Sequence, residues 1–286
     1  MRIWLAIAVL LLFPAQAIAY DLPELAAMTK PSVVLLTLWS ASEEKLATGT
    51  GFFVSKAGLI VTNHHVVVGG TRVAATLSDG REIKVVGVLA WDAARDVAIL
   101  QAEEGAEYPS LSLGDSVAVR PGDEVVVIGS PLGLSGTVSA GIVSAIREKG
   151  LTLPEDLPTP RRPHVGRLEP TTEGWGIQIT AAISAGSSGS PVMTRQGEVI
   201  AVAVGTRLDG QSVNFGVPIQ VAKDLLGGLD TKVAPRPLSV LEDKASPSEV
   251  LTNLGISAAA FAGVALVFFV VGRAKGGKKR PGPRRN

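Results

Sequence analysis

A serine lies between glycines in the segment Ala185-Gly186-Ser187-Ser188-Gly189-Ser190-Pro191. Glycine lets the backbone turn tightly and bring amide N–H groups close to a ligand, as an oxyanion site requires. The chain has no cysteine, which excludes a thiol nucleophile and cysteine-ligated zinc. Ser188 is therefore a candidate nucleophile for acyl transfer. Glycine and serine also mark ordinary turns, so the case depends on the partners of this serine.

A nucleophilic serine needs a histidine base and an acid, and their order along the chain limits the choice. The histidines are His64, His65 and His164, and none follows Ser188, which excludes the order serine, acid, histidine. The order aspartate, histidine, serine would need Asp21, at the edge of the expected mature chain. The order histidine, aspartate, serine remains, and it occurs on a double β-barrel.

His65 and Asp96 have the sequence contexts that such partners need. His65 comes shortly after the apolar run 59–62, and loops at the rim of a rigid scaffold display catalytic side chains. Asp96 directly precedes the apolar run 97–100, whereas the other aspartates before Ser188 lie in turns or at a strand end. A carboxylate that enters a core needs a buried donor, and an imidazole N–H can supply one.

The elements that must position these residues are short β-branched runs separated by turns, a pattern typical of an all-β protein that closes into barrels or sandwiches. The expected strands are 32–39, 51–54, 59–62, 72–77, 82–89, 97–101, 124–128, 138–146, 177–183 and 199–204. The expected turns are 79–80, 121–123, 196–197 and 209–210. Helical patterns are confined to 23–28 and 218–226.

Four sequence blocks between residues 23 and 229 resemble the trypsin-like serine peptidases of the bacterial high-temperature-requirement (HtrA-type) group. The blocks are Gly49-Thr50-Gly51-Phe52-Phe53-Val54 with Thr62-Asn63-His64-His65-Val66, then Asp96 to Leu100, then 127–144, and finally 178–191. The resemblance implies an all-β, chymotrypsin/trypsin-like double β-barrel over residues 20–229. The two barrels are expected at about 25–118 and 119–229.

The resemblance also assigns the roles in catalysis. The base is His65 rather than His64, because the family motif has the order Thr-Asn-any-His-Val. Asp96 is the acid, Ser188 is the nucleophile, and the N–H groups of Gly186 and Ser188 form the oxyanion hole. Ser188 would attack a peptide carbonyl and form an acyl-enzyme that water releases. No metal and no organic cofactor is expected.

The primary specificity pocket is expected at Ala182 and along the strand residues Ala203, Val204 and Gly205. In trypsin-like enzymes an acid at the position of Ala182 selects Arg or Lys. With alanine there, we expect a preference for small or medium apolar side chains.

Four positions of the nucleophile region depart from the usual family pattern. Ser187 replaces Asn and Ser190 replaces Gly, while Ser184 and Thr180 stand where Asn and Asp are common. Serine at 187 and 190 keeps the backbone donors, so we expect activity to be retained. Ser190 must fit a backbone conformation that glycine adopts more easily.

Both ends of the chain indicate a membrane address. Residues 1–19 have one Arg, an apolar run and a small-residue site, which is typical of a secretory signal peptide. Residues 254–272 are apolar and uncharged, long enough to cross a bilayer, and the basic tail 273–286 follows. The positive-inside rule then puts the tail in the cytoplasm and the catalytic domain outside the cytoplasmic membrane. Residues 230–253 would be the linker, which is too short for the PDZ module that the family often appends.

Charge limits the partners. Without Arg2 and the basic tail, the chain is acidic by about seven charges. Nucleic acid is therefore excluded as a partner, because phosphate binding needs an excess of Lys and Arg. The expected partners are protein or peptide substrates and the membrane, through the C-terminal helix, and the resemblance allows a homo-oligomer.

Three functions stay open at this stage. The leading one is an active membrane-tethered serine endopeptidase. The second is a catalytically latent, protease-like binding or scaffold protein, suggested by Ser187, Ser190 and the proline-rich loop 151–175, which is either a regulatory gate or an insertion. The third is a membrane-linked esterase with the same triad.

Overall fold

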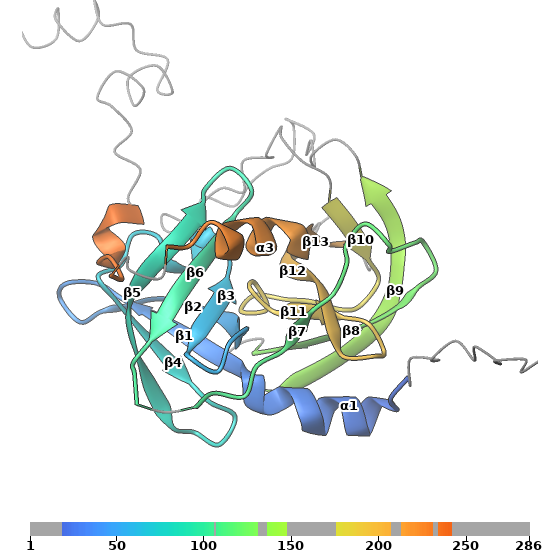
Figure 1. Ribbon diagram of the computed structural model, residues 1–286, viewed down its shortest axis with the longest axis horizontal. Helices are drawn as coiled ribbons and strands as arrows, with labels where there is room; N and C mark the ends of the chain where they lie inside the picture. Colours follow the sequence, from blue (N-terminus) through green and yellow to red (C-terminus); the bar gives the residue numbers. More distant parts are fainter. Residues whose placement is uncertain are drawn as a thin grey trace, which may run out of the picture. The chain divides into compact units, whose positions relative to one another are not determined.

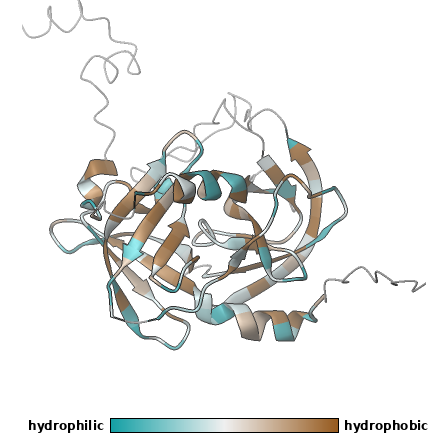
Figure 2. Cartoon of the chain, viewed as in Figure 1, coloured by the Kyte–Doolittle hydropathy of each residue, from teal (hydrophilic) through white to brown (hydrophobic). Residues whose placement is uncertain are grey.

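The computed structural model describes residues 19–105, 107–130, 136–147, 176–206, 213–230 and 234–241. Within these residues the chain folds into two β-barrels, with short helices at their margins (Figure 1). The all-β double barrel expected from the sequence is confirmed. Apolar residues (brown in Figure 2) line the strands, and polar residues concentrate in the connections.

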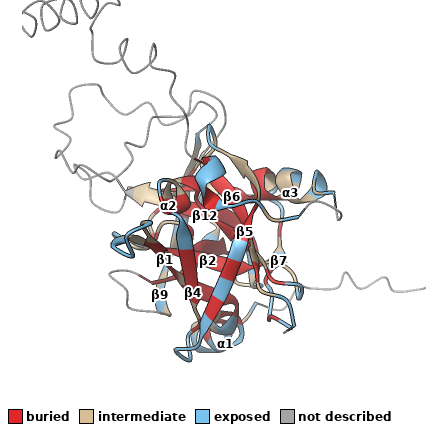
Figure 3. Cartoon of the chain, turned by 90° about the vertical axis from the view of Figure 1, so that its left-hand side faces the viewer, coloured by how far each residue is buried: buried red, intermediate tan, exposed pale blue. Residues whose placement is uncertain are grey.

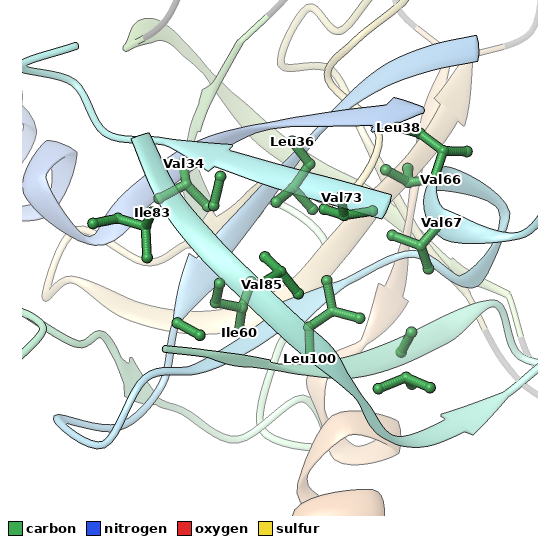
Figure 4. Close-up of a cluster of buried hydrophobic side chains, with 14 of the residues drawn as sticks. Val34, Leu36, Leu38, Ile60, Val66, Val67, Val73, Ile83, Val85 and Leu100 are labelled. Atoms are coloured by element: carbon green, nitrogen blue, oxygen red, sulfur yellow. The ribbon is translucent and has the colours of Figure 1, made fainter. Parts of the chain in front are cut away.

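The first barrel is closed in the strand order β1-β2-β3-β6-β5-β4. Its strands are β1 (Val33–Trp39), β2 (Lys45–Phe53), β3 (Leu59–Thr62), β4 (Arg72–Thr76), β5 (Glu82–Asp92) and β6 (Val97–Ala102). Every neighbouring pair is antiparallel, and β1 closes the barrel by pairing with both β2 and β4. Successive side chains of a strand point to opposite faces. Val34, Leu36 and Leu38 accordingly share the inner face and pack in the barrel core (Figure 4).

The second barrel follows the order β11-β8-β9-β10-β13-β12 and closes through the pairing of β11 with β12. Its strands are β8 (Glu124–Gly129), β9 (Thr137–Arg147), β10 (Gly176–Ile179), β11 (Pro191–Met193), β12 (Glu198–Thr206) and β13 (Asn214–Pro218). A short parallel strand, β7 (Ser112–Leu113), extends the sheet beyond β12. In Figure 3, which shows the side of the first barrel, buried residues (red) alternate with exposed ones (pale blue) along the first half of β5.

A separate apolar cluster joins the two barrels. It contains Phe52 and Ile99 from the first barrel and Ile128 and Val202 from the second, all completely buried. Helix α3 (Ile219–Gly227) spans the junction, since it contacts β5 and β6 on one side and β12 and β13 on the other. Two further helical segments precede the first barrel, α1 (Leu22–Thr29) and the 3₁₀ turn η1 (Lys30–Ser32). Asp21 caps α1, because its carboxylate accepts the Glu24 N–H at 2.8 Å.

Local pattern predicted the strands that form uninterrupted apolar runs and missed strands that lack such a run; of β2, only the end was predicted, as 51–54. The expected strand 59–62 coincides with β3, and the expected helices 23–28 and 218–226 correspond to α1 and α3. β7, β11 and β13 were not predicted, because β7 has only two residues and the other two strands contain proline or glycine, so none of them forms a continuous apolar run. The expected strand 177–183 ends at Ile179.

Several expectations lie outside the described residues. These are the signal-peptide residues 1–18, the turn 209–210, the loop 151–175 with His164, the membrane segment 254–272 and the tail 273–286. In the part of the chain that is described, no helix is long and apolar enough to cross a membrane.

Part of the expected linker 230–253 packs against the first barrel. Arg236 and Val88 exchange two backbone hydrogen bonds of 2.8 Å, and the Arg236 guanidinium lies 4.4 Å from the centre of the Trp91 ring. Beyond Arg236, the 3₁₀ turn η3 (Leu238–Leu241) buries Leu238 and Leu241 in the core of that barrel. The folded domain thus extends to residue 241, because the core of the first barrel buries these two leucines.

This docked segment predicts a clear stability pattern. Leu238→Ala and Leu241→Ala should each lower the free energy of unfolding by about 2–4 kcal/mol, as for other buried leucines. Val240→Ala is the matched control, since Val240 lies between them and is 37% exposed. It should change stability by about 0.5 kcal/mol or less. Urea unfolding of the three variants measures this, and equal values for all three would show that the segment is not docked in solution.

Candidate active site

His65 lies in a single helical turn, α2 (His64–Val67), which packs against β1 and β2 of the first barrel. Helix α2 begins directly after β3, and Asn63 makes the bend with an extended backbone (φ −79°, ψ 147°). The His65 side chain is 22% exposed and that of Asp96 is 13% exposed, so the His65 ring can contact both a partly buried acid and a substrate.

Asp96 approaches His65 from the turn between β5 and β6. Its backbone is in the left-handed region (φ 57°), which aspartate tolerates better than most residues. The buried Asn63 amide donates to the Asp96 carbonyl at 2.8 Å and holds this conformation. The Asp96 carboxylate then accepts two hydrogen bonds from His65, one from the backbone N–H at 2.9 Å and one from Nδ1 at 2.6 Å.

Ser188 lies in a tight turn between β10 and β11. Gly186 (φ 93°) and Gly189 (φ 86°) adopt left-handed conformations on either side of it. Both backbone conformations favour glycine, in agreement with the tight turn that the glycines around Ser188 predict. Among the described residues, the N–H groups of Gly186 and Ser188 have no hydrogen-bond partner, so they are available to a ligand.

The structure brings the turn that contains Ser188 close to the helix that carries His65. A side chain added at Gly49 of β2 would collide with Val66 on one side and lie 3.2 Å from the Ser188 carbonyl oxygen on the other. The Ser188 hydroxyl donates to the Val204 carbonyl at 3.2 Å. Within the described residues it makes no hydrogen bond to His65.

The expected pocket residues surround the same turn. Ala203 exchanges backbone hydrogen bonds of 2.8 Å with Gly189 and Ser190, which holds β12 beside the turn that contains Ser188. Val204 and Gly205 follow on β12, and Ala182 is exposed in the segment before the turn. Ala182 and Ala203 have small side chains, Gly205 has none, and Val204 has the largest side chain of the four.

Two of the four residues that depart from the family pattern, Ser187 and Ser190, are buried. The buried Ser187 hydroxyl accepts the Ser184 N–H at 3.3 Å, and the Ser187 N–H donates to the Ser184 carbonyl at 2.9 Å. Ser190 is completely buried, and its hydroxyl has no partner among the described residues. A side chain on Gly129 would collide with this hydroxyl, so Ser190 is accommodated by a glycine opposite.

Sequence reasoning missed three supporting residues, Thr50, Asn63 and Asn214. Each is a buried polar residue in an apolar strand or at its end. The Asn214 amide donates to the Ala181 carbonyl at 2.7 Å, beside the expected pocket. For Asn63 and Asn214 the available signal was a polar residue at the end of a strand, since burial requires a hydrogen-bond partner; Thr50, between two glycines, carried no such signal.

Two barrels with a histidine–aspartate pair and a glycine-flanked serine at their junction define a protein of the chymotrypsin-like double-barrel class. The family model for the trypsin-like peptidase domain matches residues 49–202. The chain therefore belongs to the trypsin-like peptidase family.

The chain is similar to several bacterial proteins. It is 40% identical over 187 residues to the probable periplasmic serine endoprotease DegP-like of Halomonas elongata, covering 64% of this chain and 35% of that protein. With the protein of the same name from Pseudomonas putida F1 it shares 35% identity over 241 residues, 82% of this chain and 46% of that protein. It thus spans less than half the length of these relatives. Among solved structures, the HtrA-type protease AlgW with tripeptide matches with a TM-score of 0.60 and 27% identity, over 72% of this chain and 62% of that one.

Proposed function

We propose that the protein is a membrane-anchored serine endopeptidase that hydrolyses peptide bonds in exported or membrane-proximal proteins. The observation that carries this proposal is the double hydrogen bond from His65 to Asp96, next to the glycine-flanked Ser188. Membership in the trypsin-like peptidase family supports it.

The contact between His65 Nδ1 and Asp96 supports the other ring nitrogen, Nε2, as the base. An ionised carboxylate only accepts hydrogen bonds, so the neutral ring carries its proton on Nδ1. Nε2 is then free to take the proton of Ser188 as the hydroxyl attacks a peptide carbonyl. His65 returns the proton to the leaving amine, and water releases the acyl group from Ser188 by the same steps.

The attack moves negative charge onto the carbonyl oxygen of the substrate. The N–H groups of Gly186 and Ser188 are the donors proposed to receive it, because no described residue occupies them. One such donor is worth a factor of about 10² to 10³ in kcat in related chemistry.

The pocket supports a substrate with a small or medium apolar side chain before the cleaved bond. Ala182 brings no charge to the pocket, and the strand residues Ala203 and Gly205 leave room. The solved HtrA-type relative contains a tripeptide, which supports a peptide ligand here. A preference for Arg or Lys in a peptide library would contradict this assignment of the pocket.

The proposed location is the outer face of the cytoplasmic membrane. Relatives are named periplasmic endoproteases, which supports an extracytoplasmic site. The signal peptide 1–19 and the membrane segment 254–272 would export and anchor the domain, with the tail 273–286 in the cytoplasm. Quality control or regulated proteolysis of nearby proteins is the role that such a location favours.

Labelling by a fluorophosphonate tests the proposed activity, because the reagent reacts with activated serines only. The full chain in detergent should label, and Ser188→Ala and His65→Ala should each abolish labelling. His64→Ala leaves the His65–Asp96 pair in place and is the matched control, which should still label. A folded wild-type protein that does not react would contradict the proposal.

One observation favours the alternative of a latent, protease-like binding protein. The Ser188 hydroxyl is engaged by the Val204 carbonyl rather than by His65. Catalytic hydrogen bonds are often loose in unliganded enzymes and tighten with substrate, so we rank this alternative second. The same labelling experiment separates the two, and parallel assays on peptides and simple esters separate a peptidase from an esterase.

A further inference from the structure

Thr50 connects the first barrel to the nucleophile turn of the second. It lies in β2 and is completely buried. Its backbone N–H donates to the Ser188 carbonyl at 2.8 Å, and its hydroxyl donates to the Gly186 carbonyl at 2.8 Å. Both residues proposed to form the oxyanion hole are therefore bound by the same threonine.

The direction of the hydroxyl proton is fixed by a second partner. The Ser130 N–H donates to Thr50 Oγ1 at 3.0 Å. An amide N–H can only donate, so the hydroxyl uses a lone pair toward Ser130 and must point its proton at Gly186. The Thr50 carbonyl is held as well, since it accepts the Thr62 hydroxyl at 2.7 Å.

These bonds restrain the peptide planes around the nucleophile. The carbonyl of Gly186 and the N–H of Ser187 belong to one planar unit, and they are held from opposite edges by Thr50 and by the Ser184 carbonyl. Glycine rotates about its backbone bonds at little cost, so without such restraints this plane could turn. Its rotation would alter the angle between the Gly186 and Ser188 N–H groups.

We propose that Thr50 is a positioning residue of the oxyanion hole. Its hydroxyl holds the peptide plane between Gly186 and Ser187. In this orientation the N–H groups of Gly186 and Ser188, on either side of that plane, both face one substrate oxygen. This inference rests on the proposed endopeptidase function. It assigns to the first barrel, which supplies the base and the acid, a direct part in shaping the anion site of the second barrel.

A graded set of variants tests the role of the hydroxyl. Thr50→Ser keeps the hydroxyl, Thr50→Cys replaces it with the weaker thiol donor, and Thr50→Val removes it. We expect the rate constant of fluorophosphonate labelling to stay within about threefold in Thr50→Ser. It should fall by about 10- to 100-fold in Thr50→Val, with Thr50→Cys in between.

A tetrahedral inhibitor distinguishes positioning from a general loss of structure. A peptide boronate engages both Ser188 and the oxyanion hole, whereas KM for a peptide substrate depends less on that hole. Thr50→Val should weaken boronate binding by at least about tenfold and change KM by less than about threefold. Thr29→Val is the stability control, because it removes another buried hydroxyl, bonded to the Leu25 carbonyl at 2.6 Å in α1. It should lower stability and leave boronate affinity unchanged.

The outcomes are separable. If the folded wild type does not label, both the proposed function and this inference fail. If the wild type labels and Thr50→Val labels at the same rate, this inference alone fails. Should Thr50→Val not fold, the comparison of Thr50→Ser with Thr50→Cys decides, and equal rates in those two variants would overturn the inference.

Discussion

Replacing Asp96 by asparagine is expected to lower kcat for peptide hydrolysis by about 10³- to 10⁴-fold while the protein stays folded. The reason lies in the two hydrogen bonds that the carboxylate accepts, from the N–H of His65 at 2.9 Å and from its Nδ1 at 2.6 Å. An asparagine has one oxygen, which the backbone N–H would take. The amide NH₂ would then face Nδ1 and force that nitrogen to be an acceptor, so the ring proton would move to Nε2. His65 could no longer take the proton of Ser188.

The same substitution should leave the backbone in place. Asp96 has φ 57°, and asparagine tolerates the left-handed region at least as well as aspartate. The carbonyl of residue 96 would still accept the Asn63 amide. A loss of activity without a loss of fold would therefore report on the tautomer of His65.

Asp92→Asn is the matched control in the same turn. The Asp92 carboxylate also accepts two hydrogen bonds, from the backbone N–H of Arg95 at 2.7 Å and from its Nε at 2.6 Å, but it does not contact His65. Its replacement removes the same charge and should keep kcat within about threefold of the wild type. Steady-state kinetics on a peptide, with circular dichroism for fold, measures both variants. If Asp96→Asn keeps more than about a tenth of the wild-type kcat, Asp96 does not orient the base.

The parts of the fold that the sequence predicted are those with strong local periodicity. The apolar runs of β1, β3 and β6 and the patterns of α1 and α3 extend over enough residues to define their type. β11 and β13 form strands because they pair with β12. Their own few residues contain no periodic pattern from which a strand could be predicted. The docking of η3 was not predicted for a similar reason. Leu238 and Leu241 follow prolines, a pattern typical of a linker, and only the folded first barrel provides the core that buries them.

In the site, too, the residues with a local sequence signal were predicted, and those that depend on tertiary contacts were not. Chain order and the motifs identified Ser188, His65 and Asp96 as candidates, because each requires a particular residue type next to a strand or a glycine turn. The role of Thr50 depends on contacts with residues 80 to 138 positions away, so nothing local to it could indicate its partners. The left-handed backbone of Asp96 is equally a product of tertiary contact, through the amide of Asn63.

Replacing Gly189 by alanine is expected to destabilise the protein by more than about 4 kcal/mol, which is a large share of the usual 5–15 kcal/mol for a domain. Two causes add. Gly189 has φ 86°, where an alanine costs about 1–2 kcal/mol. The new methyl group would also collide with the Thr50 carbonyl oxygen and the Thr62 hydroxyl.

The collision is costly because the atoms that it meets cannot move alone. The Thr50 carbonyl accepts the Thr62 hydroxyl at 2.7 Å, and the Gly189 N–H is bound to the Ala203 carbonyl at 2.8 Å. A shift of either strand would break hydrogen bonds that are completely buried. Relief by rotation of a flexible side chain is therefore not available.

Gly80→Ala separates the two causes. Gly80 has nearly the same backbone angle (φ 87°), but apart from its two chain neighbours no described residue lies within 4 Å of the place where its methyl group would be. It should therefore cost only about 1–2 kcal/mol, the penalty of the conformation itself. Urea unfolding of the two variants gives the difference between their losses in the free energy of unfolding. This difference is the cost of the collision between the new methyl group and β2. If both alanines lower the free energy of unfolding equally, the turn that contains Ser188 can move away from β2 at little cost. The first barrel could then not hold the Gly186 peptide firmly, and the role assigned to Thr50 would fail together with this prediction.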